Sequence, residues 1–151
     1  MVIGLEAKAD ESYGETVATY RRKALATRVA GRSTNAPERL IGLLTDIGLI
    51  SLDTHPTSGD LRYQLFSGVA GTLAAVSEPG ELAVFFVHEF ATPQTNPGKR
   101  AENRIDLSRF LGDVFGALAL DVNPWLIGPV GVPAERWARI PLYVGHCSTE
   151  S

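Results

Sequence analysis

Cysteine is nearly absent from this sequence, which contains Cys147 and no other. One thiol cannot form a disulfide within the chain, so nothing points to an oxidising compartment. Long apolar runs are also missing, because the longest, residues 82–87, is far too short to span a bilayer. Charged residues interrupt the N-terminal segment from Glu6 onward, so we expect no secretory signal peptide. These absences predict a cytoplasmic protein without a membrane segment.

An excess of basic residues is absent too, since the formal net charge is −3 at pH 7. This balance argues against a protein that coats nucleic acid generally, but it is compatible with a local basic face. Hydrophobic residues make up 44% of the chain and charged residues 21%, which is ordinary for a globular protein. The length of 151 residues, without an internal repeat, predicts one domain over residues 1–151.

Apolar strands alternate with amphipathic helices along the chain. The patterns predict strands at residues 2–7, 82–90 and 140–144. They predict helices at residues 13–30, 35–48 and 61–76, and a fourth helix that begins near Asp106. The remaining segments are interpreted as loops, at residues 51–60, 91–104 and 121–133. The prolines and glycines of the last segment argue against regular structure there.

The helix starts carry recognisable signals. Asn35 can cap the second helix, and Glu38 stands at capping-box spacing from it. Asp106 is a suitable N-cap for the fourth helix, where Ile105 and Phe110 are placed to form a hydrophobic staple. We therefore expect both helices to begin at these polar residues.

Strands that are separated by helices favour parallel pairing, because a parallel partner needs a long crossover. We predict an α/β fold with a small, mainly parallel sheet flanked by helices. The first two strands should be adjacent and parallel. The first strand has no preceding element to pair with, and an exposed apolar edge tends to be covered. This edge predicts a homodimer.

The chemical lead is Glu6-Ala7-Lys8 at the end of the first strand. Side chains alternate along a strand, so Glu6 and Lys8 project to the same side. A carboxylate can hold a hard cation such as Mg²⁺ or Mn²⁺, and a lysine can orient water or steady charge on a phosphate. The alternative is an exposed salt bridge between neighbours, which is common for this tripeptide.

The order of segments resembles the PD-(D/E)xK nuclease-like superfamily, which has the restriction-endonuclease-like fold. The resemblance covers roughly residues 2–116 and rests on four segments: VIGLEAKADESYG, LRYQLFSGVAGTL, AVFFVHEF and IDLSRFLGDVFG. It implies a metal-dependent phosphodiesterase with Glu6 as a metal ligand and Lys8 as the catalytic lysine. It also implies that Gln64, on a helix near the metal, helps to place the substrate.

The sequence departs from the family at one point. Active members carry an acidic residue, usually aspartate, on a strand before the Glu-x-Lys strand, and here Met1 precedes that strand directly. A Mg²⁺ site generally uses one or two carboxylates together with substrate phosphates. Glu15 is therefore a further candidate for the catalytic group of Glu6, Lys8 and Gln64. An active enzyme and an inactive relative both remain open.

Basic residues supply the candidate nucleic-acid contacts. Arg21, Arg28 and Arg32 would share one face of a continuous helix beside the site. Arg62 begins the third helix and is a further candidate. The alternatives are a solvated helix face for the first three and a polar helix start for Arg62.

Three functions follow from these patterns. The first is a nuclease-like domain that hydrolyses nucleic-acid phosphodiesters with Mg²⁺ or Mn²⁺. The second is a non-catalytic interaction protein that keeps the fold and pairs through its first strand or apolar residues. The third is a domain that binds a small molecule in the cleft at the strand ends.

Overall fold

The structure is a computed structural model that describes residues 1–49, 59–78 and 80–150. Most of the loop expected at residues 51–60 lies outside the described residues. The described helices and strands follow one another as β1 (Val2–Lys8), α1 (Val17–Val29), α2 (Ala36–Asp46), α3 (Tyr63–Ala74), β2 (Ala83–Ala91), α4 (Pro97–Phe115), β3 (Trp125–Val130), the 3₁₀ turn η2 (Glu135–Trp137) and β4 (Leu142–Glu150). None of the helices in these ranges is long and apolar enough to cross a membrane.

The described strands form one sheet in the order β1-β2-β4-β3. β1 pairs with β2 in parallel, as expected from the long helical crossover, and β2 pairs with β4 in parallel. β3 runs antiparallel to β4 at the far edge. The fold is therefore α/β, with one sheet flanked by helices. The sheet is mixed, so the prediction of a mainly parallel sheet was wrong.

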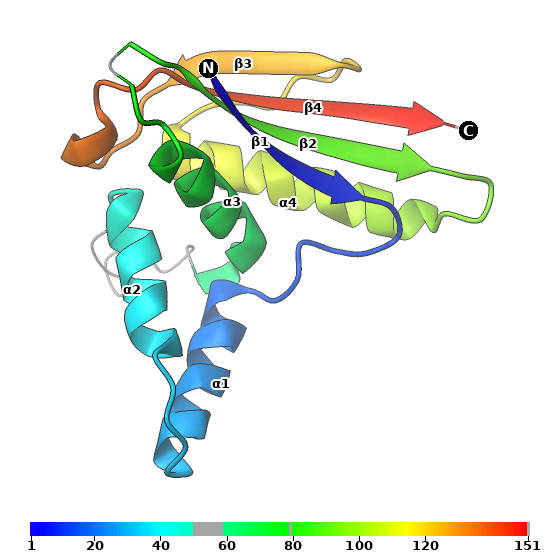
Figure 1. Ribbon diagram of the computed structural model, residues 1–151. Helices are drawn as coiled ribbons and strands as arrows, with labels where there is room; N and C mark the ends of the chain where they lie inside the picture. The colour runs from blue at the N-terminus through cyan, green and yellow to red at the C-terminus, as the bar shows by residue number, and fades with distance from the viewer. Residues whose placement is uncertain (50–58, 79, 151) are drawn as a thin grey trace.

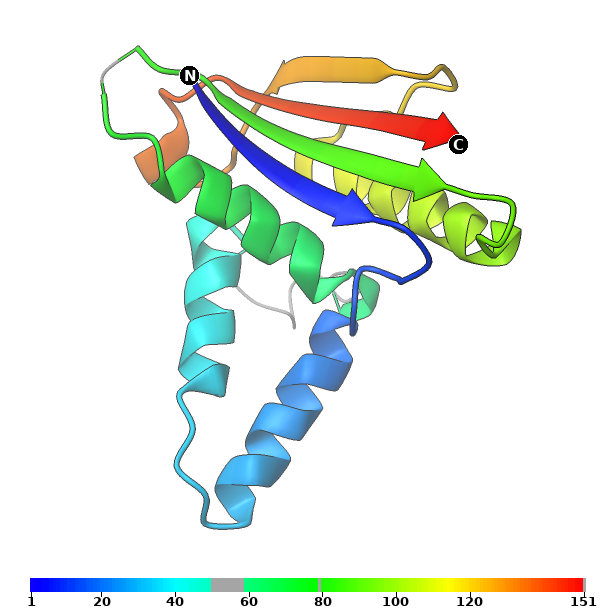
Figure 2. The same ribbon diagram turned by 45° about the vertical axis from the view of Figure 1, so that its right-hand side comes forward.

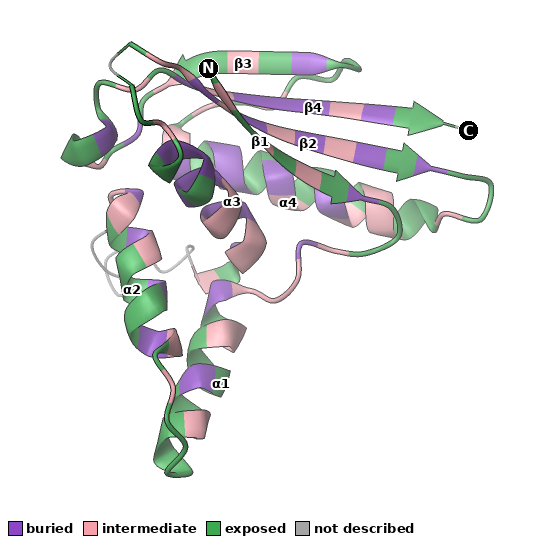
Figure 3. Cartoon of the chain, in the orientation of Figure 1, coloured by how far each residue is buried: buried purple, intermediate pink, exposed green. Residues whose placement is uncertain are grey.

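The molecule has a helical layer on one face of the sheet. Figures 1 and 2 show α3 beneath β1 and α4 beneath the middle of the sheet, with α1 and α2 extending away below α3. The core fills the space between this layer and the sheet. Phe66 of α3 meets Phe110 of α4 edge to face at 5.0 Å between ring centroids, and both are fully buried. Figure 3 shows buried residues alternating with less buried ones along β2, as expected for a strand with one face against the core.

α3 packs directly on the sheet at positions where glycine stands at the contact. A Cβ on Gly4 of β1 would lie 1.8 Å from the Thr72 hydroxyl oxygen of α3. A Cβ on Gly68 of α3 would lie 2.5 Å from the Phe85 ring of β2. No larger residue fits either contact without displacement. The approach brings the N-terminal turn of α3, with Gln64, to the end of β1.

The predicted start of the fourth helix was wrong. α4 begins at Pro97, so residues 97–104 are helical, and Asp106 lies inside the helix instead of capping it. Its N-cap is Asn96, whose side chain accepts from the Gly98 N–H at 2.8 Å, with proline in the first turn. Ile105 is consequently exposed rather than part of a staple. The polar composition of the first two helical turns concealed this helix.

The segment at residues 121–133 also differs from the expectation, because it contains β3. This strand carries Pro129 at the edge of the sheet, where a missing N–H costs no ladder hydrogen bond, and its register shifts between Ile127 and Val130. β4 extends to Glu150, beyond the expected end at residue 144. At α2, Asn35 holds the N-cap position without a side-chain hydrogen bond, so the expected capping box is not formed.

Candidate active site

Polar side chains gather at the carboxyl ends of the three parallel strands, on the face that the helices cover. Lys8 of β1, Glu89 of β2, and His146 and Ser148 of β4 are all buried there. Asn103 of α4 is buried as well, and its amide donates to the Glu11 carbonyl at 3.0 Å. The carboxyl ends of parallel strands are where α/β proteins place their ligands. Buried polar groups cost free energy unless they are hydrogen-bonded or paired, so the partners of each group matter.

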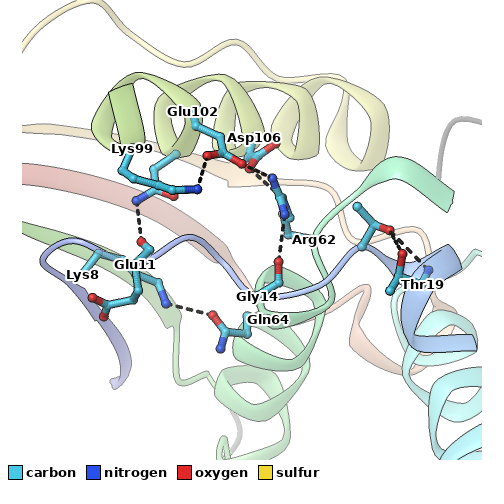
Figure 4. A network of polar contacts seen from close by, with 11 residues as sticks. Lys8, Glu11, Gly14, Thr19, Arg62, Gln64, Lys99, Glu102 and Asp106 are labelled. Carbon is cyan, nitrogen blue, oxygen red and sulfur yellow. Dashed lines mark hydrogen bonds and ion pairs between the residues drawn. The ribbon is translucent and has the colours of Figure 1, made fainter. Parts of the chain in front are cut away.

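Glu6 and Lys8 form the first part of this site. They project to the helical face of β1, and Lys8 Nζ lies 2.7 Å from Glu6 Oε1. The same ammonium donates to Gln64 Oε1 at 2.8 Å, a contact visible in Figure 4. It lies 5.3 Å from the centre of the Tyr13 ring, and its side chain is only 3% exposed. The lysine is thus held in a fixed position by a carboxylate, an amide and an aromatic ring.

Glu89 forms the second part. It is the register partner of Lys8 on the neighbouring strand and is 2% exposed. Glu89 Oε2 lies 3.1 Å from His146 Nε2, while Oε1 has no hydrogen-bond partner among the described residues. Strand spacing and rise place the Cα atoms of Glu6 and Glu89 roughly 8 Å apart. Two carboxylates therefore lie as diagonal neighbours on one face, and one of them has a free buried oxygen.

Tyr13 closes the site from the loop after β1. Burial raises the pKa of the Tyr13 phenol, and the nearby carboxylates of Glu89, Glu6 and Asp106 raise it further. The Tyr13 hydroxyl has no hydrogen-bond partner within the described part of the chain. The phenol therefore remains protonated and lies among three carboxylates.

This protonated phenol makes stability sensitive to alkaline pH. Because its folded pKa exceeds the ordinary value near 10, unfolding releases the Tyr13 proton above that pH. The wild type should lose about 1.4 kcal/mol of unfolding free energy by pH 11 relative to Tyr13→Phe, and nothing below pH 9. Urea denaturation of both proteins across this range measures the difference. Parallel stability curves would contradict the assignment.

Arg62 links the loop that contains Tyr13 to the helices α3 and α4. Arg62 Nε donates to Asp106 Oδ2 at 2.7 Å, Nη2 to Glu102 Oε1 at 2.5 Å and Nη1 to the Gly14 carbonyl at 2.8 Å. Lys99 donates to Glu102 as well and, together with Arg62, holds the pKa of the Glu102 carboxyl below its usual value. Figure 4 shows this network beside Lys8 and Gln64. The guanidinium, proposed from the sequence as a nucleic-acid contact, is thus bonded to protein groups.

The other predicted site residues lie elsewhere. The Glu15 carboxylate pairs with Lys23 of α1 rather than with Lys8. Arg28 pairs with Glu38 of α2 at 2.5 Å. Arg21 is exposed on α1, whereas Arg32 follows the end of that helix. The expected stripe therefore does not extend over one continuous helix, because α1 ends at Val29.

Sequence reasoning missed Glu89, His146 and Tyr13 as parts of the site. The alternation of β2 contained a usable signal, because Glu89 shares a face with the buried Phe85 and Val87. Parallel pairing with β1 then places Glu89 beside Lys8. Nothing local identified His146, because the polar second half of β4 does not have the apolar pattern of a buried strand.

The donor set fits one kind of metal site. Among the described residues no group of three or more His, Cys, Asp or Glu side chains could hold an ion. Glu6 and the free oxygen of Glu89 supply two carboxylates, and Mg²⁺ is often bound by one or two carboxylates completed by water and substrate phosphate. The residues fit such an open site and do not fit an ion enclosed by protein ligands.

Comparisons with known proteins place the chain in a family. No curated protein and no solved structure matches it. One family model matches residues 1–151, the whole chain. The protein therefore belongs to the family DUF6946, which is described as a domain of unknown function.

Proposed function

We propose that this protein is a metal-dependent nuclease-like domain that hydrolyses phosphodiester bonds of nucleic acids at Glu6 and Lys8. The observation that carries the proposal is the buried Lys8 ammonium, held between Glu6 and Gln64 and adjacent to Glu89 at the strand ends. Carboxylates beside a fixed cation are the groups that phosphodiester hydrolysis needs. The restriction-endonuclease-like fold is part of the same proposal, supported by the Glu-x-Lys strand, its helical crossover and its parallel partner.

Each residue has a distinct role in this proposal. Glu6 and Glu89 would hold Mg²⁺ or Mn²⁺, and His146 keeps Glu89 in place through its hydrogen bond. When bound, such an ion would polarise the phosphate and lower the pKa of a coordinated water. Lys8 stabilises the negative charge that develops on the phosphate, and Gln64 fixes the position of Lys8. Arg21 stays a candidate for contact with the nucleic-acid backbone, because it is exposed on α1.

Two measurements on the wild-type chain test the proposal. Calorimetric titration with Mg²⁺ and Mn²⁺ should give binding, and single- and double-stranded DNA and RNA should be cleaved in a reaction that EDTA stops. Cleavage that persists in EDTA would remove the metal from the proposal. The absence of both binding and cleavage would instead favour the interaction protein.

A specific observation supports that second candidate, a protein that self-associates. None of the described helices covers the second face of the sheet, here called the outer sheet face. Its outward-pointing residues are mostly apolar, and several are well exposed. They include Ile3, Leu5, Val84, Phe86, Phe90, Leu126 and Tyr143. A contiguous exposed apolar patch often marks an interaction surface.

A second copy of the chain is the occupant we propose for the outer sheet face. The outward positions of β1, β2 and β4 contain no Asp, Glu, Lys or Arg, so two identical faces meet without like-charge contact. Four strands of about seven residues outline roughly 400 Å², from a spacing of about 4.8 Å and a rise of about 3.3 Å. This flat outline is about half of the roughly 800 Å² per partner that a stable interface buries, and corrugated side chains add to it.

Leu5→Lys should convert such a dimer to a monomer, because it places a charge in the middle of an apolar contact. The matched control is Ile105→Lys on α4, since Leu5 and Ile105 are both 63% exposed but lie on opposite layers. Light scattering after gel filtration at micromolar concentration gives the mass. A monomeric wild type, or a dimer that survives Leu5→Lys, would sink self-association through this face.

A further inference from the structure

The helices α1 and α2 and the segment between them form an arm that projects from the rest of the molecule. Figures 1 and 2 show both helices extending away from the sheet. The buried residues of α1 are Val17 and Ala24, so the second half of this helix has no residue in the core. Residues 17–46 are here called the helical arm. The exposed half of α1 leaves a surface that another molecule can contact.

The base of the helical arm is fixed to the start of α3. The Val17 N–H donates to the Leu61 carbonyl at 2.9 Å. The Tyr20 ring stacks on the Tyr63 ring, with 4.1 Å between centroids and 6° between planes. The arm therefore has a defined direction relative to the candidate active site, whose Gln64 follows Tyr63 directly on α3.

The helical arm concentrates the positive charge of the chain. It contains six of the 14 Lys and Arg residues but only two of the 17 Asp and Glu residues. The formal net charge of the arm is therefore +4, whereas the remaining residues together have −7. A polyanion is attracted to the arm and repelled by the rest of the molecule.

Most of these cations are not neutralised by neighbouring carboxylates. Lys23 pairs with Glu15, and Arg28 pairs with Glu38 at 2.5 Å. The other four are exposed arginines that make no ion pair within the part of the chain that the structure describes. They are Arg21, Arg22, Arg32 and Arg39. Their guanidinium groups are available to an anionic partner.

The placement of these arginines suits a chain of phosphates rather than one small anion. Arg21 and Arg22 lie on α1, Arg32 lies between the two helices and Arg39 lies on α2. The sequence predicted a stripe on one helix, whereas the structure distributes the positive charge over the whole arm. A guanidinium matches a phosphate in shape and charge, and contacts of this kind dominate binding to a nucleic-acid backbone.

An anionic membrane is the other polyanion to consider, and α1 is poorly suited to it. A helix that lies on a membrane buries a wide apolar face opposite its charged face. The exposed large apolar residues of α1 are Leu25 and Val29. Leu25 follows Arg21 by four positions and Arg22 by three, so it shares a face with both arginines instead of opposing them.

The length of the arm defines the size of the partner. α1 has 13 residues, which corresponds to a length of about 20 Å, and it begins close after Tyr13 of the candidate site. A duplex advances about 3.4 Å per base pair, so the arm corresponds to about six base pairs. A duplex is rigid on this scale, and a duplex bound along the arm therefore has a fixed position at the site.

We propose that the helical arm binds the phosphate backbone of a double-stranded nucleic acid, over about six base pairs beside the bond that is hydrolysed. Binding by the arm stands on its charge and geometry alone. The position relative to the hydrolysed bond rests on the proposed function. DNA and RNA duplexes share this backbone chemistry, and the experiment separates them.

The test measures binding in EDTA, where no metal-dependent cleavage occurs. Fluorescence anisotropy with a labelled DNA duplex of about 24 base pairs gives the association constant across a series of NaCl concentrations. Four phosphate contacts predict a slope of about −3.6 for the logarithm of this constant against the logarithm of the salt concentration. An RNA duplex of equal length identifies the preferred nucleic acid. A single strand should bind at least tenfold more weakly than the preferred duplex.

A triple variant assigns the binding to the helical arm. Arg21→Gln, Arg22→Gln and Arg32→Gln together should weaken duplex binding at least tenfold and reduce the slope to about −0.9. Glutamine forms helices about as well as arginine, so α1 should be retained. Circular dichroism checks that the variant is folded.

The matched control removes the same charge outside the arm. Arg104→Gln, Arg109→Gln and Arg139→Gln together change three exposed arginines of α4 and of the segment before β4. Binding and slope should stay at the wild-type values. Equal losses in the two triple variants would indicate a general charge effect and overturn the proposal.

Further outcomes separate this proposal from the proposed hydrolysis. Binding to phosphatidylserine vesicles without binding to either duplex would overturn the proposal in favour of a membrane. Single strands that bind as tightly as duplexes would overturn it as well. Duplex binding through the arm without Mg²⁺-dependent cleavage would support the arm and remove the hydrolysis. If cleavage occurs, shortening the duplex to about six base pairs should lower kcat/KM at least tenfold for the wild type but not for the arm variant.

Discussion

Glu6→Gln is expected to abolish both Mg²⁺ binding and cleavage, with a loss of at least about 100-fold in rate. Glutamine keeps the size of the side chain but removes the negative charge that a hard cation requires. Only Glu89 would then remain as a carboxylate, and a single carboxylate is a weak Mg²⁺ site. Calorimetry and single-turnover cleavage on the same preparation measure the two effects.

The matched control is Glu135→Gln. Glu135 is exposed and lies in η2, directly before β4, and hence at the end of the sheet opposite the strand carboxyl termini. It removes the same charge from the chain without touching the site, so binding and cleavage should stay at the wild-type level. Equal losses in the two variants would indicate a general charge effect and count against a metal site at Glu6.

Lys8→Met separates chemistry from metal binding. The ammonium that now neutralises Glu6 at 2.7 Å would be gone, so the ion should bind at least as tightly as before. The charge that steadies the phosphate would be gone as well, and cleavage should fall about 100-fold or more. A variant that cleaves at the wild-type rate would remove Lys8 from the proposed chemistry.

The apolar elements of the fold were predictable from the sequence. Residues 82–87 have the continuous apolar character of a central strand, and β2 is found there between β1 and β4. The long crossover between residues 7 and 82 predicts parallel pairing, and the register of β1 with β2 confirms it. These strands are buried, and burial requires the apolar residues whose pattern predicts the strands from the sequence.

Prediction failed where polar residues occupy buried positions. The first two turns of α4 are hydrophilic, yet they cover the polar strand ends, where Asn103 is buried and Arg100 donates to the Ser148 hydroxyl at 2.7 Å. The second half of β4 is polar for the same reason, since His146 and Ser148 face the site. The elements that build such a site have polar residues at buried positions, so they lack the apolar pattern from which helices and strands are predicted. Prediction from local pattern therefore fails at the candidate site.

Strand alternation correctly predicts that Glu6 and Lys8 share one face of β1. The residues around them come from distant parts of the chain, which the sequence pattern does not reveal. Lys8 meets Gln64 across 56 residues, and Glu89 meets His146 across 57. Only the packing of α3 onto β1 and the order of the strands bring these partners together. Glu15 shows the converse, because it is near Glu6 in sequence but pairs with Lys23 on α1.

Arg62→Met is expected to give the largest loss of stability among surface-accessible charges, about 3 kcal/mol of unfolding free energy. Methionine keeps the aliphatic stem but removes three hydrogen bonds that join α3, α4 and the loop after β1. Asp106 and the Gly14 carbonyl would lose their partners. The Arg62 and Asp106 side chains are only 17% and 13% exposed, so water compensates poorly for that loss.

Arg136→Met is the comparison for an exposed ion pair. Arg136 bonds Asp46 at 2.8 Å, but its side chain is 58% exposed, so the loss should stay within about 1 kcal/mol. Denaturant unfolding measures the stability of both variants. The same measurement on Asp106→Asn, alone and combined with Arg62→Met, gives the coupling energy between Arg62 and Asp106. A stability loss for Arg62→Met no larger than for Arg136→Met would mean that the network does not hold the loop.

The Arg62 network also supports the position of Lys8, because Gln64 follows Arg62 by two residues and Gly14 follows Tyr13. Loss of the network should therefore release Lys8 from its fixed position, and cleavage should fall together with stability.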